Sequence, residues 1–217
     1  MTPGTVAAIL RPTGLFFRDT MSNMSKGART REQVVERAAA LFNQLGYQGA
    51  SLSDIMSATG LKKGGIYRHF PNKQQLELEA FEFAVQKMRE RFAQALRGKH
   101  GARERLLAIV AVYTTLPANP PVPGGCPVLN AAVEADDAYP ALRERAQHVM
   151  NELKRFLKDV LRDGVKSGEF RSGLDLERTA STTMALLEGA VMLSKLYGNQ
   201  HSMRHAALHL EAWFESF

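Results

Sequence analysis

Residues 52–73 of this 217-residue chain read LSDIMSATGLKKGGIYRHFPNK, and this stretch decides the fold. Ser51 precedes apolar positions at helical spacing and can cap a helix, with Asp54 at the capping-box position. Residues 59–61 then make a turn, and a second short helix starts at the lysines that follow. The stretch therefore predicts a helix-turn-helix.

The second helix of this pair contains residues that do not favour a helix. Lys62 and Lys63 place positive charge at the helix end where the macrodipole already favours anions. Gly64 and Gly65 follow, and each glycine costs a helix interior about 1 kcal/mol relative to alanine. A phosphate backbone would supply the missing anion, and glycines allow close approach. We interpret this helix as a DNA-reading surface; the alternative is an ordinary helical corner with solvated lysines.

The positions from the turn onward are similar to a known family. Residues 59–73, TGLKKGGIYRHFPNK, resemble the signature of the TetR family of bacterial transcriptional regulators at fifteen successive positions. Two positions depart from the usual pattern: Lys62 stands where these proteins often carry a helix-capping serine, and Gly65 where they often carry threonine. With the helix before it, the resemblance covers residues 29–76, and the remainder resembles the family only in its helical pattern.

The resemblance implies a homodimeric DNA-binding regulator, usually a repressor, that a small molecule releases from a palindromic operator on double-stranded DNA. In such proteins Tyr67 and Lys73 would hold the DNA backbone, while the glycines, the lysines of the second helix and His69 would lie nearest the base edges. We add a phosphate contact from Ser51 at the start of the preceding helix. The predicted DNA-binding residues are Ser51, Lys62, Lys63, Gly64, Gly65, Tyr67, His69 and Lys73.

The excess positive charge lies at the same end of the chain. The formal net charge is +6, and residues 1–75 hold 10 Lys/Arg against 4 Asp/Glu, whereas residues 76–217 hold 18 of each. This asymmetry is expected of a nucleic-acid module joined to a neutral partner domain. The single cysteine excludes an intrachain disulfide and suits a reducing cytoplasm. Because no apolar run reaches the roughly 18 residues of a membrane span, we expect a cytoplasmic protein without membrane segments.

The N-terminal residues are predicted to form a disordered tail. Residues 6–10 are apolar, but no basic start precedes them and no long apolar region follows, so they make a poor secretory signal. Met21 and Met24 lie close to where proteins of this family usually begin. An upstream start that is not used in the cell, over residues 1–23, is one interpretation, and a basic arm that reaches DNA is the other.

Helical spacing recurs along the rest of the chain, so we predict an all-α fold. Thr30 and Gln33 form a capping box for a first helix that ends at Gly46. Asn72 can cap a long helix that runs to Gly98, about 40 Å at 1.5 Å per residue, and this helix could carry a displacement between domains. The predicted parts are a tail at 1–28, a three-helix helix-turn-helix domain at 29–76, and a larger helical ligand-binding and dimerisation domain at 77–217.

The last two helices are predicted to form the dimer interface. Between Thr179 and Ser194 only Glu188 is charged, so this helix is apolar on nearly every side and needs cover on both. One subunit offers one core, and a partner subunit offers the second. TetR-like proteins dimerise through this pair of helices, and Gly189 and Ala190 would allow close approach. The final helix has one broad apolar face, made of Met203, Ala206, Ala207, Leu210, Trp213, Phe214 and Phe217.

The larger domain supplies more apolar and methionine surface than polar anchors, which suits a pocket for a small, largely apolar effector. A filled core is the alternative. The predicted lining residues are Tyr113, His148, Met150, Phe156, Met184 and Leu187. Cys126 and Asn130 join them, because a branch of TetR-like regulators shows a similar Gly-Cys step before a helix with an asparagine shortly after.

Cys126 also supports a second functional hypothesis. It precedes Pro127, a residue suited to the first helical position, so its thiol lies at or beside a helix N-cap, where the dipole can lower the thiol pKa. A redox or electrophile sensor regulator that acts through Cys126 is therefore the alternative function. The simpler interpretation of this cysteine is a small buried residue.

Patterns that would indicate an enzyme are weak. The chain has no nucleophile elbow, phosphate loop or zincin motif, and the adjacent Asp136 and Asp137 fit a loop. His201, His205 and His209 have the i, i+4, i+8 spacing that can hold a metal, but they fall on the side of the last helix away from its apolar face. We predict a solvent-facing polar stripe there, and no catalytic residue, cofactor or metal.

Overall fold

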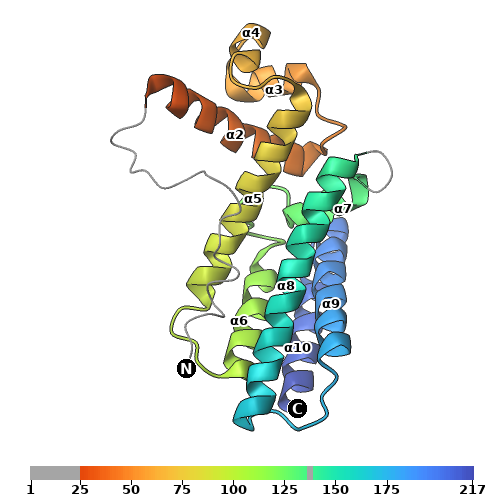
Figure 1. Cartoon of the computed structure of the whole chain (residues 1–217). Coiled ribbons are helices and arrows are strands. Elements are labelled where there is room, and N and C mark those ends of the chain that lie inside the picture. Colours follow the sequence, from red (N-terminus) through yellow and green to blue (C-terminus); the bar gives the residue numbers. More distant parts are fainter. Residues whose placement is uncertain (1–24, 136–138) are drawn as a thin grey trace. The chain divides into compact units, whose positions relative to one another are not determined.

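The computed structural model describes residues 25–135 and 139–217, and every regular element in these ranges is an α-helix (Figure 1). The predicted all-α fold is confirmed. The described residues form two compact units: residues 25–87 with 122–146 make one, and Met88–Pro121 with Gln147–Phe217 make the other. The chain therefore passes between the units three times. Most of the predicted tail, and the adjacent Asp136 and Asp137, lie outside the described residues.

The unit that contains residues 52–73 begins with three helices, α2 (Lys26–Leu45), α3 (Leu52–Thr59) and α4 (Lys63–Tyr67). The predicted capping box at Thr30 and Gln33 is wrong, because α2 starts about one turn earlier, within the segment predicted as tail. Ser25 caps it, with its hydroxyl accepting from the Ala28 amide at 3.2 Å. Thr30 lies inside the helix instead, where its hydroxyl donates to the Lys26 carbonyl. The helix ends at Gly46, as predicted, and Gly46 has a positive φ of 89°.

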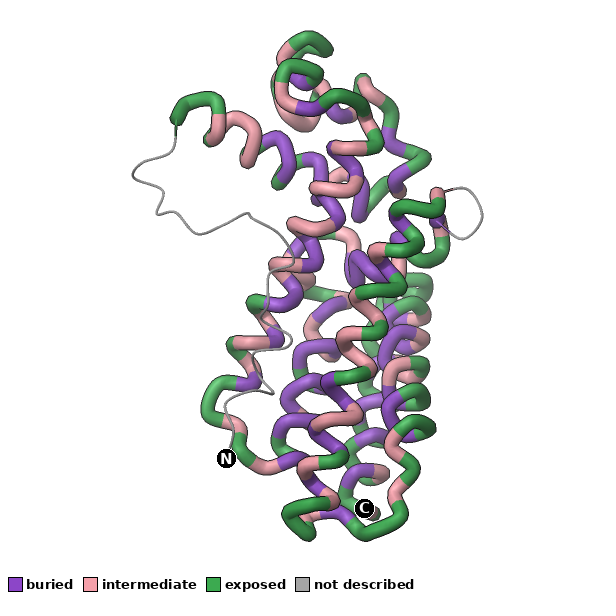
Figure 2. Tube along the Cα trace, in the orientation of Figure 1, coloured by how far each residue is buried: buried purple, intermediate pink, exposed green. Residues whose placement is uncertain are grey.

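The core of this unit forms where the inner faces of these helices meet, and Figure 2 shows α3 and α4 exposed on their outer sides. Phe42, Tyr47, Ile55, Ile66 and Phe70 are each at most 2% exposed. The rings of Phe42 and Tyr47 stack at 5.5 Å between centroids. The apolar side of each short helix is thus buried in the core, and the polar side remains exposed to solvent.

The long helix α5 (Lys73–Ala95) starts in this unit, and its predicted cap is confirmed. The Asn72 side chain accepts from the Gln75 amide at 2.8 Å. Arg31 of α2 is fixed to α5 by an ion pair with Glu79 at 2.6 Å, and its guanidinium lies 4.7 Å from the centre of the Phe70 ring. These contacts fix the start of α5 against the helix-turn-helix.

The same unit is completed by segments distant in sequence, α7 (Pro127–Glu134) and the first turns of α8 (Pro140–Ser167). Arg145 of α8 pairs with Glu82 of α5 at 2.7 Å, and the Tyr139 hydroxyl donates to the Gln74 carbonyl at 3.1 Å. Helix α7 therefore belongs with the helix-turn-helix, although it lies inside the range predicted for the larger domain.

The second unit is a helical bundle in which α6 (Ala102–Thr115), α9 (Leu176–Tyr197) and α10 (His201–Glu215) lie beside the later part of α8 (Figure 1). Two buried arginines join its helices through ion pairs. Arg89 of α5 pairs with Glu152 of α8 at 2.6 Å, and Arg105 of α6 pairs with Asp163 at 3.1 Å. Asp175 caps the start of α9, and its carboxylate accepts from the Arg178 amide at 3.0 Å.

Helices α9 and α10 each bury one face within the chain and leave another uncovered. The predicted apolar face of α10 is buried at Met203, Ala206, Ala207, Leu210 and Phe214, whereas Trp213 and Phe217 are partly exposed. The three histidines of this helix are exposed, as predicted. Large apolar side chains remain in solvent: Met192 is 47% exposed, Leu196 70%, Tyr197 66% and Leu208 58%. Among the described residues, no helix is long and apolar enough to cross a membrane.

Candidate nucleic-acid interface

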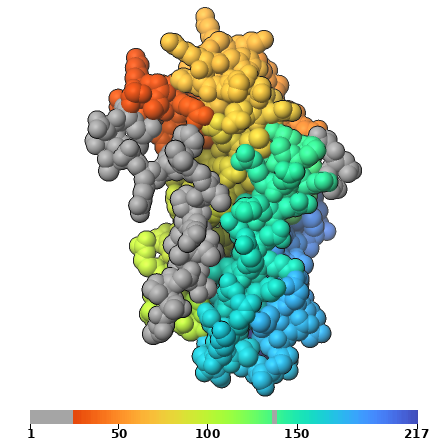
Figure 3. Space-filling view, in the orientation of Figure 1, coloured from red at the N-terminus to blue at the C-terminus, as the bar shows by residue number. Residues whose placement is uncertain are grey.

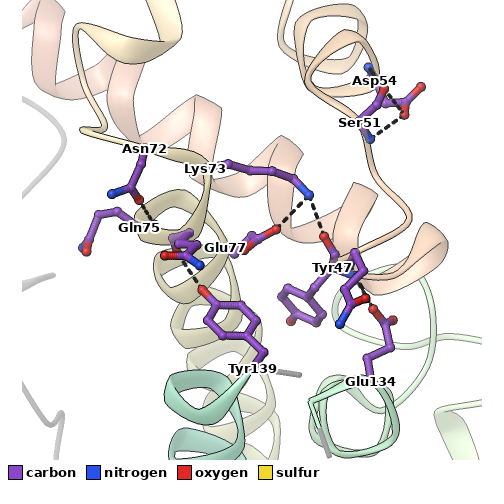
Figure 4. Close-up of polar contacts among 11 residues, drawn as sticks. Tyr47, Ser51, Asp54, Asn72, Lys73, Gln75, Glu77, Glu134 and Tyr139 are labelled. Carbon is purple, nitrogen blue, oxygen red and sulfur yellow. Dashed lines mark hydrogen bonds and ion pairs between the residues drawn. The ribbon is translucent and has the colours of Figure 1, made fainter. Parts of the chain in front are cut away.

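Helix α3 is held at its start by the predicted capping box. The Ser51 hydroxyl accepts from the Asp54 amide at 3.2 Å, and the Asp54 carboxylate accepts from the Ser51 amide at 2.8 Å (Figure 4). The hydrogen bond from the Ser51 hydroxyl, followed by that from its amide, lowers the pKa of the Asp54 carboxyl. Gly60 ends the helix with φ 71°, a left-handed conformation that glycine adopts without strain. The turn that aims α4 is therefore determined by local chemistry.

Helix α4 is anchored from one side only. Ile66, 2% exposed, is its single buried residue, and Phe70 just beyond it is 1% exposed. Lys62 occupies the N-cap with no side-chain hydrogen bond to the helix, because a lysine side chain carries no acceptor for the backbone amides of the first turn. In Figure 3, side chains project from the surface at the α4 end of the helix-turn-helix and are uncovered in this view. This geometry leaves both lysines available to an external anion.

The two glycines of α4 are not required by the folded chain. A Cβ at Gly64 would meet no atom within 4 Å, and a Cβ at Gly65 would lie at an ordinary contact distance of 3.5 Å from Leu61. Neither has a positive φ. Glycine weakens a helix without any internal benefit at these positions, so packing within the chain does not account for the two glycines.

The predicted DNA-binding residues belong to this end of the helix-turn-helix, and all of them are at least partly exposed. Ser51, Lys62, Lys63, Gly64 and Tyr67 are exposed, and Gly65, His69 and Lys73 are partly exposed. The Lys63 ammonium lies 6.0 Å from the centre of the Tyr67 ring, so the two side chains occupy one patch. That each of these residues contacts DNA remains a prediction.

Lys73 differs from the other residues of this set, because its ammonium is occupied within the chain. It donates to the Tyr47 carbonyl at 2.8 Å and pairs with Glu77 at 2.9 Å (Figure 4). Burial raises the pKa of the Glu77 carboxyl, and the hydrogen bond from Lys73 opposes that rise. Lys73 therefore joins the start of α5 to the turn after α2, a role that sequence spacing did not indicate.

Two arginines at this end were not among the predicted residues. Arg68 is exposed between Tyr67 and His69, and its position within the signature was the available signal. Arg37 of α2 donates to the carbonyls of Ala58 and Thr59 at 3.2 and 3.3 Å. Arg37 thus satisfies the end of α3 from a neighbouring helix, an interaction that no local pattern reveals.

We expect Gly64→Ala to affect folding and DNA binding in opposite directions. The added methyl group enters open space on a helical residue, so it should stabilise the fold by about 0.5 kcal/mol. On a surface that approaches DNA closely, the same methyl group should weaken binding about tenfold, equivalent to about 1.4 kcal/mol. Urea denaturation and fluorescence anisotropy with a DNA duplex measure the two effects.

Gly27→Ala is the matched control for that variant. Gly27 is the second residue of α2 as Gly64 is of α4, is exposed, and also has nothing within 4 Å of its missing Cβ. It should stabilise the protein similarly and leave DNA binding unchanged. Equal DNA affinity of Gly64→Ala and the wild type would contradict close approach at α4.

The predicted effector-lining residues fall in both compact units. Tyr113, Phe156 and Leu187 are buried in the helical bundle, where Met150 and Met184 are partly buried and His148 is exposed beside Glu152. Cys126 and Asn130 belong to the unit of the helix-turn-helix. Cys126 is the N-cap of α7, as predicted, and is 3% exposed.

A buried carboxylate adds a polar group that the sequence prediction did not include. Glu188 is 8% exposed, and the Tyr113 hydroxyl donates to its Oε1 at 2.7 Å. The Tyr113 ring also contacts Phe92, with 5.9 Å between ring centres. The signal available in the sequence was the isolation of Glu188 as the one charge within a long apolar stretch, since a buried charge needs a polar partner.

Known proteins match both parts of the chain. Residues 34–80 match the family described as bacterial regulatory proteins, tetR family, and residues 102–210 match the tetracyclin repressor-like C-terminal domain. A TetR transcriptional regulator of Chloroflexus aurantiacus J-10-FL has a crystal structure that is 46% identical, covers 88% of this chain and 96% of its own, and superposes with a TM-score of 0.85. The chain belongs to the TetR family.

Other TetR family members are similar over most of their length. The HTH-type transcriptional regulator LmrA of Bacillus subtilis (strain 168) is 28% identical over 178 residues, 81% of this chain and 92% of LmrA. The fold is shared with a cysteine-substituted TetR family regulator, CifR, solved in complex with a 26-base-pair operator, at 22% identity, a TM-score of 0.73 and coverage of 90% and 98%. TetR family proteins are DNA-binding transcriptional regulators, and this chain carries the family's helix-turn-helix.

Proposed function

We propose that this TetR family protein is a cytoplasmic repressor that binds a palindromic operator as a homodimer and leaves it when a small, largely apolar effector binds. The observation that carries the proposal is the uncovered basic end of the helix-turn-helix, with two glycines that the fold itself does not need. Helix α4 would enter the major groove, as recognition helices do. Phosphate contacts would position it, and base contacts would specify the sequence.

Dimer formation is supported by the uncovered faces of α9 and α10. Met192 and Leu196 of α9 and Leu208 of α10 present large apolar surface that the chain does not cover. Gly189 lies three positions before Met192 on α9, and a Cβ there would meet nothing within 4 Å, which leaves space for a partner helix. A two-fold axis through this surface would bring α9 and α10 of two subunits together as four helices, which agrees with the dimer interface predicted from the sequence.

Effector release follows from the geometry of a dimer on DNA. The helix-turn-helix of each subunit, here called a reading head, must fit one half-site of the operator. Successive major grooves lie about 34 Å apart, so a small change in head spacing would spoil the fit. The effector must bind the DNA-incompetent arrangement more tightly, because equal affinity for both arrangements shifts nothing. The apolar interior around Phe92, Tyr113 and Phe156 supplies aromatic surface for such a ligand, and Glu188 supplies a polar anchor.

We do not favour the alternative of a redox or electrophile sensor acting through Cys126. The residue is 3% exposed at the start of α7, and the chain has one cysteine, so no second thiol within the same chain can resolve an oxidised sulfur. Burial makes a small structural residue the better account.

Selection from a random library of DNA duplexes, followed by calorimetry, tests the proposed function. We expect the protein to enrich an inverted repeat and to bind it as a dimer. With an effector found by screening apolar compounds, linkage requires DNA to lower effector affinity by the same factor that effector lowers DNA affinity. Failure to enrich any duplex would contradict the DNA-binding proposal, whereas an effector indifferent to DNA would contradict only the release mechanism.

A further inference from the structure

A loop and helix from the middle of the chain are fastened to the end of α2 by buried asparagines. Asn43 of α2 is 2% exposed. Its side-chain amide donates to the carbonyls of Pro123 at 2.9 Å and Gly125 at 3.2 Å, in the loop before α7. An amide group buried this far is expensive to leave unpaired, so these bonds hold the loop in one position.

Asn130 of α7 donates to the same two segments, the end of α2 and the loop before α7. Its side-chain amide donates to the Asn43 backbone carbonyl at 3.0 Å, to the Asn43 side-chain oxygen at 2.8 Å, and to the Gly124 carbonyl at 3.0 Å. The two asparagines thus bind each other and both bind the loop. Because the Asn43 amide holds the loop and the Asn43 oxygens accept from Asn130, movement of either side chain would break several of these hydrogen bonds.

Glu134 fastens the other end of α7. Its carboxylate accepts from the backbone amides of Tyr47 at 2.7 Å and Gln48 at 3.1 Å, in the turn that leads from α2 to α3 (Figure 4). Lys73 holds the carbonyl of the same Tyr47. The turn between α2 and α3 is therefore held by Lys73 of α5 and by Glu134 of α7.

Two glycines allow the backbone approach that these contacts need. Gly124 has φ 115°, and a Cβ there would overlap the Asn43 carbonyl. Gly46 has φ 89°, and a Cβ there would overlap the Glu134 carboxylate. A side chain at either position would separate α7 from α2, which explains why both positions carry glycine.

We propose that Asn43, Asn130, Gly124 and Glu134 form a clamp that must be closed for α3 and α4 to bind DNA, and that opening it is the step by which DNA affinity falls. The inference rests on the proposed function as a DNA-binding regulator. The loop in question starts at Val122, where the chain passes from the unit containing α6 to the unit containing the helix-turn-helix. A displacement of the end of α6 therefore reaches the clamp along the backbone of a short connecting segment.

Cys126 reports on the clamp directly. It is the only cysteine of the chain, it is 3% exposed, and it follows the loop carbonyls that Asn43 and Asn130 hold. A thiol reagent can modify such a residue only when the segment opens locally. The labelling rate of Cys126 in the full-length protein thus measures how often the clamp opens.

The test combines this rate with DNA affinity for a duplex selected from a random library. Asn130→Ala, which deletes three hydrogen bonds, should raise the Cys126 labelling rate about tenfold and weaken DNA binding about tenfold. Glu134→Ala, at the other end of α7, should act in the same direction. Saturating DNA should slow labelling of the wild type, because DNA must oppose the opening that lowers its affinity.

Exposed residues outside the clamp supply the controls. Asn151→Ala and Glu144→Ala on α8 should change neither readout. A labelling rate for Asn130→Ala equal to that of the wild type would overturn the clamp, whatever the DNA result. If the folded variants are labelled faster but bind DNA with unchanged affinity, these interactions only stabilise the fold. That result would overturn the proposed coupling between clamp opening and DNA affinity. Absence of any selected duplex for the wild type would instead contradict the proposed function.

Discussion

The double variant Leu196→Glu, Leu208→Glu should be a monomer and should bind its operator about 100-fold more weakly than the wild type, the scale on which bivalent binding exceeds single-site binding. These leucines are 70% and 58% exposed on adjacent helices, so charge is tolerated within one subunit. In a two-fold interface, the two glutamates of each subunit would place unpaired carboxylates in an apolar environment and repel those of the symmetry-related subunit. Light scattering measures the oligomeric state, and anisotropy with the selected duplex measures affinity.

Val133→Glu is the control for this variant. Val133 is also a large apolar residue in solvent, at 72% exposed, but it lies on α7 and outside the proposed interface. It should leave the dimer intact. Gly189→Trp offers an independent test, because its side chain would enter open space in one subunit and block a partner helix. A Leu196→Glu, Leu208→Glu protein that stays dimeric would place the interface elsewhere.

The second large effect is expected at α4. The triple variant Lys62→Ala, Lys63→Ala, Tyr67→Ala should bind the operator about 1000-fold more weakly, because removing one side chain that binds DNA costs about 1–3 kcal/mol. The dependence of log affinity on log salt should also become shallower by about one unit for each phosphate that the variant no longer neutralises. The fold should be retained, since none of the three side chains is buried.

A charge-matched control separates specific recognition from net charge. Lys166→Ala, Arg204→Ala removes two exposed cations from the other compact unit and should change affinity little. Single variants then divide the roles: Lys63→Ala should relax sequence preference, whereas removing a side chain that binds only phosphate should weaken binding to all sequences alike. Undiminished operator binding by the triple variant would refute the assignment of α4 as the reading helix.

The structure gives Lys73 contacts that the sequence-based prediction did not include. Sequence similarity assigned this lysine to the DNA backbone, whereas the folded chain uses its ammonium to hold the Tyr47 carbonyl and the buried Glu77. The hydrogen bond with Tyr47 joins positions 26 residues apart, and the partner is a backbone oxygen that carries no sequence signal. A side chain's choice between an internal and an external partner depends on what the fold brings within reach.

The sequence alone determined the features that depend on neighbours three or four positions away. The capping box of Ser51 and Asp54, the Asn72 cap and the turn at Gly60 are all set by hydrogen bonds or dihedral limits within one turn of helix, so their residue types were sufficient. The start of α2 was missed because Ser25 and Thr30 both offer caps within a short stretch, and local chemistry does not rank them.

Only the tertiary structure decided which distant groups meet. Asn43 and Asn130 are 87 positions apart, and Tyr113 and Glu188 are 75 apart, yet each pair is hydrogen-bonded inside the fold. Helical periodicity shows that a face is buried, but it does not say which other face covers it. That choice rests on the packing of whole helices and on glycines, such as Gly124, that let two backbones come close. For this protein, local sequence determined the helix-turn-helix of α3 and α4, and long-range packing determined which side chains of α5 and α7 hold the turn before it.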